Sequence, residues 1–121
     1  MSNVPDAMQE LMKLDGSIAV SLVDFESGMT LGQAGGGSSF NIDIAAAGNT
    51  QVVRSKMLVM QNLGLETYIE DILITLGNQY HLIRPLQSSP SLFLYVALDR
   101  NKANLGMARH QLAQIEKKLD I

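Results

Sequence analysis

The sequence contains no cysteine and no tryptophan, and only 5% of its residues are aromatic. Without cysteine, neither a disulfide framework nor a thiolate metal site can form. Scarce aromatic side chains argue against base stacking on single-stranded nucleic acid. The net charge is −3 and no basic run is present, whereas nucleic acids are held by clustered lysine and arginine. We therefore expect no nucleic-acid partner.

Long hydrophobic runs are also missing. No segment reaches the roughly 18 consecutive apolar residues that a membrane span requires, and the first residues lack the apolar run of a signal peptide. The sequence does have 46% hydrophobic residues over a length of 121, which is enough for one compact core without staples. We expect a single domain over residues 1–121 of a cytoplasmic protein, with no membrane insertion.

Hydrophobic periodicity predicts three helices and five strands. In chain order these are a helix over 4–14, strands over 17–24 and 29–34, a long helix over 41–63, strands over 68–76, 80–84 and 92–98, and a last helix capped by Asp99 or Asn101. The strand over 92–98 is almost wholly apolar, which is typical of a central strand covered on both faces. The order predicts an α+β fold of three layers, with a five-stranded antiparallel sheet between helices.

The long helix carries two apolar stripes, whereas the last helix carries one. At about 100° per residue, the first stripe contains Ile42, Ala46, Val53, Met57 and Met60. The second stripe contains Ala45, Gly48, Val52, Val59 and Leu63, with Asn49 and Lys56 between the two. A helix on the surface of a monomer needs one stripe to cover its own core, so the second stripe indicates a partner.

Candidate catalytic and metal-binding residues are few. The glycine-rich stretch 32–39 lacks the lysine of a phosphate-binding loop. His81 and His110 fall on different predicted elements without an obvious ligand partner, so a structural and a solvated histidine are favoured over a metal site. A turn contact explains Asp24 better than general-base chemistry does. We expect no catalytic residue, no cofactor, no metal and no small-molecule substrate.

Four stretches of the sequence, in their order and spacing, are similar to the roadblock family. This is the dynein light-chain group, whose bacterial relatives act with small Ras-like GTPases. The stretches are VSLVDFESGMTLG over 20–32, AAAGNTQVVR over 45–54, YHLIRPL over 80–86 and FLYVALDRNKANLGMAR over 93–109. The resemblance implies a profilin-like fold of order α-β-β-α-β-β-β-α and a homodimer.

In that family fold, the strand predicted over 68–76 is an edge strand that joins its twin across a two-fold axis. Residues 72–74 form an apolar run without lysine or proline, and an unprotected edge of this kind invites aggregation unless it is paired. The alternative is that this strand is internal and the long helix is simply well buried. The candidate dimer interface consists of Ala45, Gly48, Asn49, Val52, Lys56, Val59, Ile72, Leu73 and Ile74.

The outward face of the long helix is the candidate surface for a further partner. Arginine can stabilise charge on a transferred phosphoryl group, but a solvated arginine is favoured for Arg54 over a catalytic finger. The resemblance implies that a GTPase docks near this helix, and Leu58 is the better docking candidate. The candidate partner-binding residues are Gln51, Arg54, Ser55 and Leu58.

The resemblance implies a non-enzymatic homodimer that regulates a small Ras-like GTPase through its switch regions, by activating it or by modulating nucleotide exchange. A dimeric scaffold with no effect on nucleotide turnover is the alternative, because it would use the same dimer. A small-ligand sensor is disfavoured, since a core of leucine, isoleucine and valine with few inward polar side chains gives little reason to expect a pocket.

Overall fold

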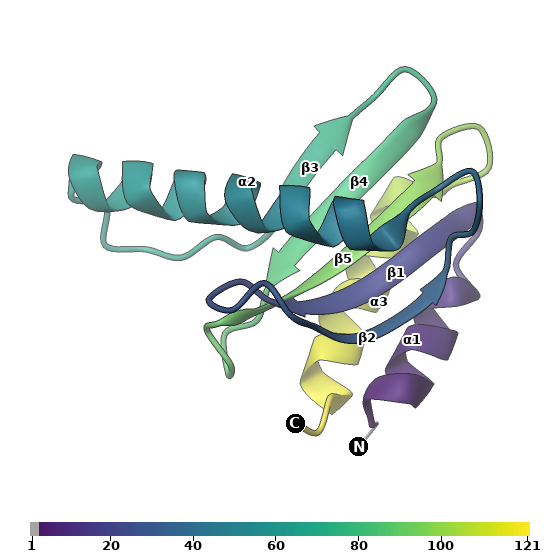
Figure 1. Cartoon of the computed structure of the whole chain (residues 1–121), viewed down its shortest axis with the longest axis horizontal. Helices are drawn as coiled ribbons and strands as arrows, with labels where there is room; N and C mark the ends of the chain where they lie inside the picture. The colour runs from purple at the N-terminus through teal and green to yellow at the C-terminus, as the bar shows by residue number, and fades with distance from the viewer. Residues whose placement is uncertain (1–2) are drawn as a thin grey trace.

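The computed structural model describes residues 3–121, which form three helices and five strands in the predicted order (Figure 1). The elements are α1 Val4–Met12, β1 Ser17–Asp24, β2 Thr30–Gly35, α2 Ile42–Leu63, β3 Ile72–Thr75, β4 Gln79–Pro85, β5 Leu92–Asp99 and α3 Leu105–Lys118. Within this part of the chain, no helix is both long and apolar enough to cross a membrane.

The five strands form one antiparallel sheet with the order β2-β1-β5-β4-β3. The central strand is β5, whose residues from Leu92 to Leu98 are all buried, as its apolar run predicts. The strands at the two edges are β2 and β3. The α+β fold class is therefore confirmed, and so is the position of β3 at an edge, which makes the alternative of an internal strand wrong.

Helices cover both faces of the sheet, giving three layers (Figure 1). On one face, α1 and α3 pack over a core that includes Leu11, Leu22 and Leu112. On the other face, α2 crosses the strands over a smaller core that includes Phe93 and Tyr95. Alternate residues of β1 and β5 belong to the two cores, because successive side chains of a strand point to opposite faces.

Asparagine caps start all three helices. The Oδ1 atom of Asn3 accepts a hydrogen bond from the Asp6 N–H at 2.9 Å, and that of Asn41 accepts from the Ile44 N–H at 3.1 Å. Gly64 ends α2 in the left-handed conformation, with φ of 68°, as expected for a glycine after a helix.

The start of α3 differs from the prediction. Its cap is Asn104, which accepts from the Met107 N–H at 3.0 Å, and not Asp99 or Asn101. Asp99 instead accepts from the Asn101 N–H at 2.9 Å, and its backbone carbonyl accepts from the Ala103 N–H. These bonds make a separate turn between β5 and α3, so the helix begins later.

The strand β3 is also shorter than predicted, since only Ile72–Thr75 of the range 68–76 is a strand. The register pairs Ile72 with Ile83, so a longer strand would bring residue 70 opposite Pro85. Proline has no N–H to donate to a ladder, which accounts for the early end of the pairing. The strand predicted over 17–24 agrees with β1 at both ends, and the remaining predicted bounds lie within two residues of the observed ones.

Candidate functional site

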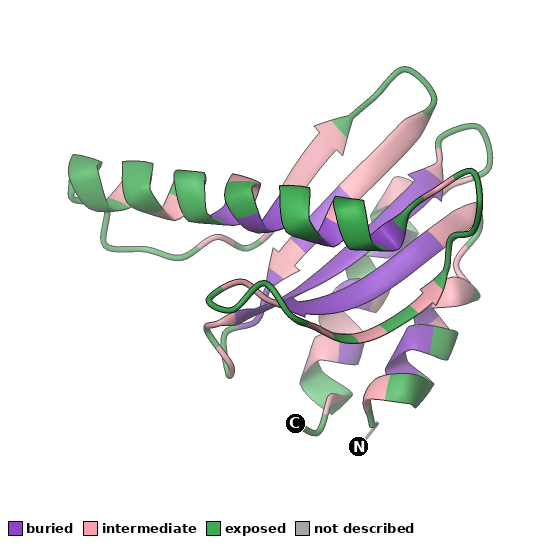
Figure 2. Ribbon diagram, viewed as in Figure 1, coloured by how far each residue is buried: buried purple, intermediate pink, exposed green. Residues whose placement is uncertain are grey.

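The candidate site is built around the second half of α2, which extends past the β3 edge of the sheet (Figure 1). Five residues of α2 are buried, all of them before Arg54, and they are Ile42, Ala46, Asn49, Thr50 and Val53. After Val53, no residue of α2 is fully buried, and the exposed turns are green in Figure 2. We call residues 54–71, which comprise this half of α2 and the segment returning to β3, the arm.

The second apolar stripe of α2 lies largely uncovered. Ala45 and Val52 are half-buried, while Gly48 and Val59 are exposed and Leu63 is 66% exposed. A shallow hollow runs along this side of the helix, lined by Gln51, Val52, Ser55, Lys56 and Val59. The predicted stripe therefore has few covering residues within the described chain, and an uncovered apolar stripe is typical of an interface.

Gly48 has open space around it, because a Cβ atom built there would meet nothing within 4 Å. The monomer therefore gives no packing reason for a glycine at this position, although glycine in a helix interior costs about 1 kcal/mol relative to alanine. The open space at Gly48 lies on the same stripe as Val52 and Val59. Close approach of a second helix is a physical use for a residue without a side chain.

Asn49 is placed differently from the other candidate interface residues on α2. It is only 8% exposed and lies beneath the helix, near Tyr95 of β5. Lys56, in contrast, is exposed. The rotation of α2 on the sheet therefore turns Asn49 into the chain's own core and away from the surface that Gly48 and Val59 share.

The outer edge of β3 lies next to the arm. This strand pairs only with β4 among the described strands, and its residues Ile72, Leu73 and Ile74 are half-buried. Ile72 and Ile74 pack with the core under α2, whereas Leu73 packs on the other face. The three side chains therefore pack within the single chain, and the outer backbone N–H and C=O groups of β3 are not paired with another described strand.

The outward face of α2 holds the four candidate partner-binding residues. Gln51 and Ser55 are exposed, and Leu58 is 57% exposed. Arg54 is exposed too, but its Nη2 donates to the backbone carbonyl of Glu26 at 2.6 Å. That carbonyl belongs to the β1–β2 turn, where Asp24 Oδ1 accepts from the Glu26 N–H at 2.9 Å, which confirms the predicted turn contact. Arg54 is therefore held against the turn.

Ile44 is a candidate surface residue that the sequence analysis missed. It is 71% exposed on the first turn of α2. It precedes Gln51 and Leu58 by seven and fourteen residues, so the three lie along one line of the helix. The spacing of seven was the available signal, but isoleucine next to Ile42 is easily attributed to the core.

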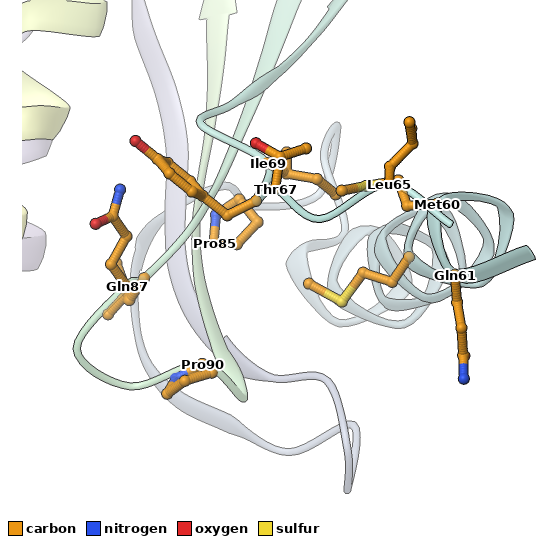
Figure 3. Close-up of a pocket in the computed structure, with 11 residues that line it drawn as sticks. Met60, Gln61, Leu65, Thr67, Ile69, Pro85, Gln87 and Pro90 are labelled. Carbon is orange, nitrogen blue, oxygen red and sulfur yellow. The ribbon is translucent and has the colours of Figure 1, made fainter. Parts of the chain in front are cut away.

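A hollow of about 570 Å³ lies between the arm and the loop from β4 to β5 (Figure 3). Its apolar lining includes Met57, Met60, Leu65, Ile69, Pro85 and Pro90. The lining also includes Leu86, which belongs to the core under α1 and α3. The sequence offered little reason to expect a pocket, and the structure corrects that expectation, because the hollow forms where the arm leaves the sheet and not inside the core. Met57 and Met60 belong to the first apolar stripe of α2, beyond Val53, the last buried residue of the helix.

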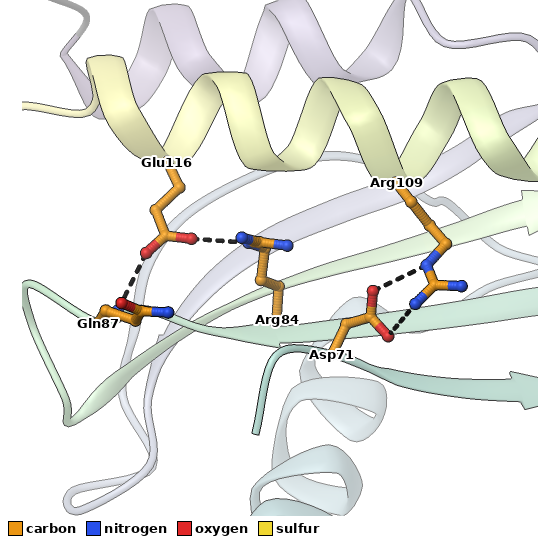
Figure 4. A network of polar contacts seen from close by, with 5 residues as sticks. All are labelled: Asp71, Arg84, Gln87, Arg109 and Glu116. Atoms are coloured by element: carbon orange, nitrogen blue, oxygen red, sulfur yellow. Dashed lines mark hydrogen bonds and ion pairs between the residues drawn. The ribbon is translucent and has the colours of Figure 1, made fainter. Parts of the chain in front are cut away.

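Two ion pairs anchor the surroundings of the arm to α3 (Figure 4). Arg109 binds Asp71 with two hydrogen bonds of 2.9 Å, at the point where the arm returns to β3. Arg84 Nε donates to Glu116 Oε1 at 2.6 Å, and Glu116 Oε2 accepts from the Gln87 N–H at 3.0 Å. The base of the arm and the end of β4 are therefore fixed to the helix on the opposite face.

Histidines and acids do not gather into a site. Across residues 3–121, no three histidine, aspartate or glutamate side chains are grouped as they would be around a metal ion. His81 lies on β4 beneath α2, where burial lowers its pKa, and His110 is exposed on α3. The described surface of α2 thus combines apolar and neutral polar side chains with the two cations Arg54 and Lys56.

No family model and no curated protein matches this sequence. Solved structures match at low identity. A Roadblock/LC7 domain from Streptomyces avermitilis is 14% identical, with a TM-score of 0.81 over 97% of this chain and 94% of that one. Myxococcus xanthus MglB is 17% identical, with a TM-score of 0.83 over 95% and 83%. The gliding protein mglB from Thermus thermophilus is 16% identical, with a TM-score of 0.68 over 93% and 87%. The chain therefore has the fold of the Roadblock/LC7 domain.

Proposed function

We propose that this protein is a homodimeric, non-enzymatic regulator of a small Ras-like GTPase in the cytoplasm. The observation that carries the proposal is the arm, which extends past an open strand edge with exposed apolar side chains such as Val59 and Leu63. An apolar stripe and a free edge on the same side of a domain are liabilities unless another chain covers them. The similarity of fold to MglB and to a Roadblock/LC7 domain supports it.

In the proposed dimer, the two β3 strands pair across a two-fold axis and the two α2 helices pack over that axis. A two-fold interface uses the same patch of both copies, so a stripe that contains Gly48 meets itself. The absence of a side chain at Gly48 would let the two helix backbones come close. Each arm would then lie over the sheet of its partner, covering the stripe that is open in one chain.

The GTPase would bind the outward face of α2, through Gln51, Ser55 and Leu58, with Ile44 extending the same line. A protein that binds one switch conformation more tightly than the other shifts the GTPase toward that conformation, without covalent chemistry. The bond from Arg54 to the Glu26 carbonyl favours a positioning role for this arginine over entry into a nucleotide site.

The test is the mass of the protein by light scattering, alone and with the small Ras-like GTPase whose gene lies nearest, loaded with GDP or with a GTP analogue. A dimer that binds one nucleotide state at least tenfold more tightly supports the proposal. Equal binding of both nucleotide states would favour the alternative function, a dimeric scaffold with no effect on nucleotide turnover. A monomer at micromolar concentration would overturn both, because each depends on the dimer.

A further inference from the structure

A small polar cluster lies in the otherwise apolar layer between α2 and the sheet. It consists of His81 and Gln79 on β4, Tyr95 on β5 and Asn49 on α2. Tyr95 is completely buried and Asn49 is 8% exposed. Polar groups in such a place are costly unless they are bonded to one another, so their arrangement requires a physical account.

The two hydrogen bonds of His81 determine which groups of the cluster donate and which accept. Its Nε2 lies 2.8 Å from Gln79 Oε1, and its Nδ1 lies 3.2 Å from the Tyr95 hydroxyl. Because an amide oxygen can only accept, Nε2 of the neutral ring carries the hydrogen and Nδ1 is the acceptor. Tyr95 therefore donates its hydroxyl hydrogen to His81. The Phe40 and Tyr95 rings each pack against the imidazole in a T-shaped arrangement, with centroids 6.1 and 5.5 Å away.

Besides His81, Tyr95 has two neighbours with an unpaired side-chain atom. Asn49 Nδ2 and Ser21 Oγ are the two buried side-chain atoms without a hydrogen-bond partner within residues 3–121. The Asn49 amide is close enough to Tyr95 to affect the pKa of its hydroxyl, and Ser21 is directly opposite Tyr95 in the register of β1 and β5. Asn49 is therefore the neighbour of the Tyr95 hydroxyl, whereas Ser21 lies beside Tyr95 on the strand away from His81.

The surroundings favour the neutral ring. Burial lowers the pKa of His81. Burial also raises the pKa of Tyr95 to about 12, and the Asn49 amide acts against this rise. The groups that pack on His81 from other elements are Tyr95 and Ala97 from β5, Ile74 from β3 and Phe40 before α2. Asp99 is on the same face of β5, opposite Gln79, but no ion pair to His81 exists in the described chain.

We propose that the cluster is a protonation switch, in which uptake of a proton by His81 reverses the bond to Tyr95 and shifts the position of α2 on the sheet. The proton comes from solvent and binds Nδ1, which then becomes a donor. The Tyr95 oxygen must accept from it, so the Tyr95 hydrogen must turn to another acceptor. The side chain of Asn49 provides one if its amide turns to present Oδ1 in place of the unpaired Nδ2. A change at Asn49 is transmitted to α2, which carries both candidate interaction surfaces.

This switch does not depend on which partner α2 binds, so it can be tested on the protein alone. The measurement is an NMR titration from pH 7.5 to pH 4.5 that follows the ring nitrogens of His81 and the backbone amides of Thr50 and Val53 on the buried side of α2. We expect the ring to be the Nε2–H tautomer at neutral pH. We expect the two amides to move with the same midpoint as the ring, below the ordinary value for histidine.

Three variants make the test specific. Tyr95→Phe removes only the hydroxyl, and we expect the His81 ring still to titrate while the Thr50 and Val53 amides lose their response. His81→Gln should abolish the response by removing the titrating group. His110→Gln, on the exposed face of α3, is the matched control and should change nothing at α2. The proposal would be overturned if the amide signals of Thr50 and Val53 did not shift with the titration of His81, or if they still shifted in Tyr95→Phe.

Discussion

Arg54 of α2 donates a hydrogen bond of 2.6 Å to the backbone carbonyl of Glu26, 28 residues earlier in the chain. The bond ties the start of the arm to the turn between β1 and β2. Because both groups are exposed, water can replace either partner, and the net value of the bond is small. Its importance lies in orientation, since it holds a long side chain at a fixed place on the outward face of α2.

The first prediction concerns this bond. Arg54→Ala should lower the free energy of unfolding by about 0.5 kcal/mol, the low end for an intramolecular hydrogen bond, because both partners are exposed. It should leave the mass in solution unchanged. Urea unfolding and light scattering measure the two quantities. Gln51→Ala, one turn earlier on the same face, is the control and should have a smaller effect on unfolding. Equal effects of the two substitutions would show that the bond to Glu26 contributes nothing.

The second prediction separates the stability of the chain from its association. Gly48→Ala should stabilise the helix by about 1 kcal/mol through propensity alone, because a Cβ atom there meets nothing within the chain. Gly48→Leu should also keep the fold stable but weaken the proposed dimer by at least tenfold, since its side chain obstructs close approach of two helices. Sedimentation at several concentrations checks this, and a Gly48→Leu dimer as tight as wild type would place the interface elsewhere.

The third prediction concerns the arm. Val59→Asp should dissociate the proposed dimer while changing the stability of the monomer by less than about 1 kcal/mol, because Val59 is exposed in the single chain. Met107→Asp, at a similarly exposed apolar position on α3, is the matched control and should leave the dimer intact. Dissociation by the control and not by Val59→Asp would move the interface to the face covered by α1 and α3.

The fourth prediction compares the two ion pairs near the arm. The side chains of Arg84 and Glu116 are both largely buried, so Glu116→Gln leaves a buried charge without its partner and should cost about 3 kcal/mol. Asp71→Asn should cost only about 1 kcal/mol, because Arg109 is half exposed and water can solvate it. Urea unfolding of both variants tests the order, and a larger loss for Asp71→Asn would contradict it.

The fifth prediction is the pH dependence of stability. Burial lowers the pKa of His81, so between its ordinary value of 6.5 and its lower folded value the unfolded chain binds more protons than the folded one. The free energy of unfolding should therefore fall as the pH drops below 6.5 and level off below the folded pKa. His81→Gln should make urea midpoints at pH 7 and pH 5.5 more alike, whereas His110→Gln should not.

The sequence was sufficient wherever a local signal had one interpretation. The apolar run of β5 identifies a central strand, and hydrophobic periodicity places the start of α2 within one residue, both without tertiary information. Three residues before α3 can cap a helix, at positions 99, 101 and 104. The turn that leaves Asn104 as the cap is held by bonds to distant residues, from the Asp99 N–H to the Gly16 carbonyl and from the Arg100 N–H to the Asn78 carbonyl. A local rule could not choose among them.

The position of Asn49 shows why the site was only partly predictable. A helical wheel places it between two apolar stripes, but whether that line of the helix meets the sheet or a partner depends on the rotation of α2. In the structure, this line of the helix meets the sheet, and Asn49 lies near Tyr95 of β5. Tyr95 is 46 residues away in the sequence, so no local pattern contains this information. The length of β3 likewise depended on its register with Pro85.

The length of α2 beyond Val53 sets how far the helix can reach over a second subunit. The ten residues of α2 that follow Val53 extend about 15 Å along the helix axis at 1.5 Å per residue, and neighbouring strands are about 4.8 Å apart. In the proposed dimer, the free half of each helix would therefore reach across at most about three strands of the other sheet. Adding or removing one helical turn would move the end of the helix by about the width of one strand. The number of residues between Val53 and Gly64 would therefore determine where the two subunits contact each other.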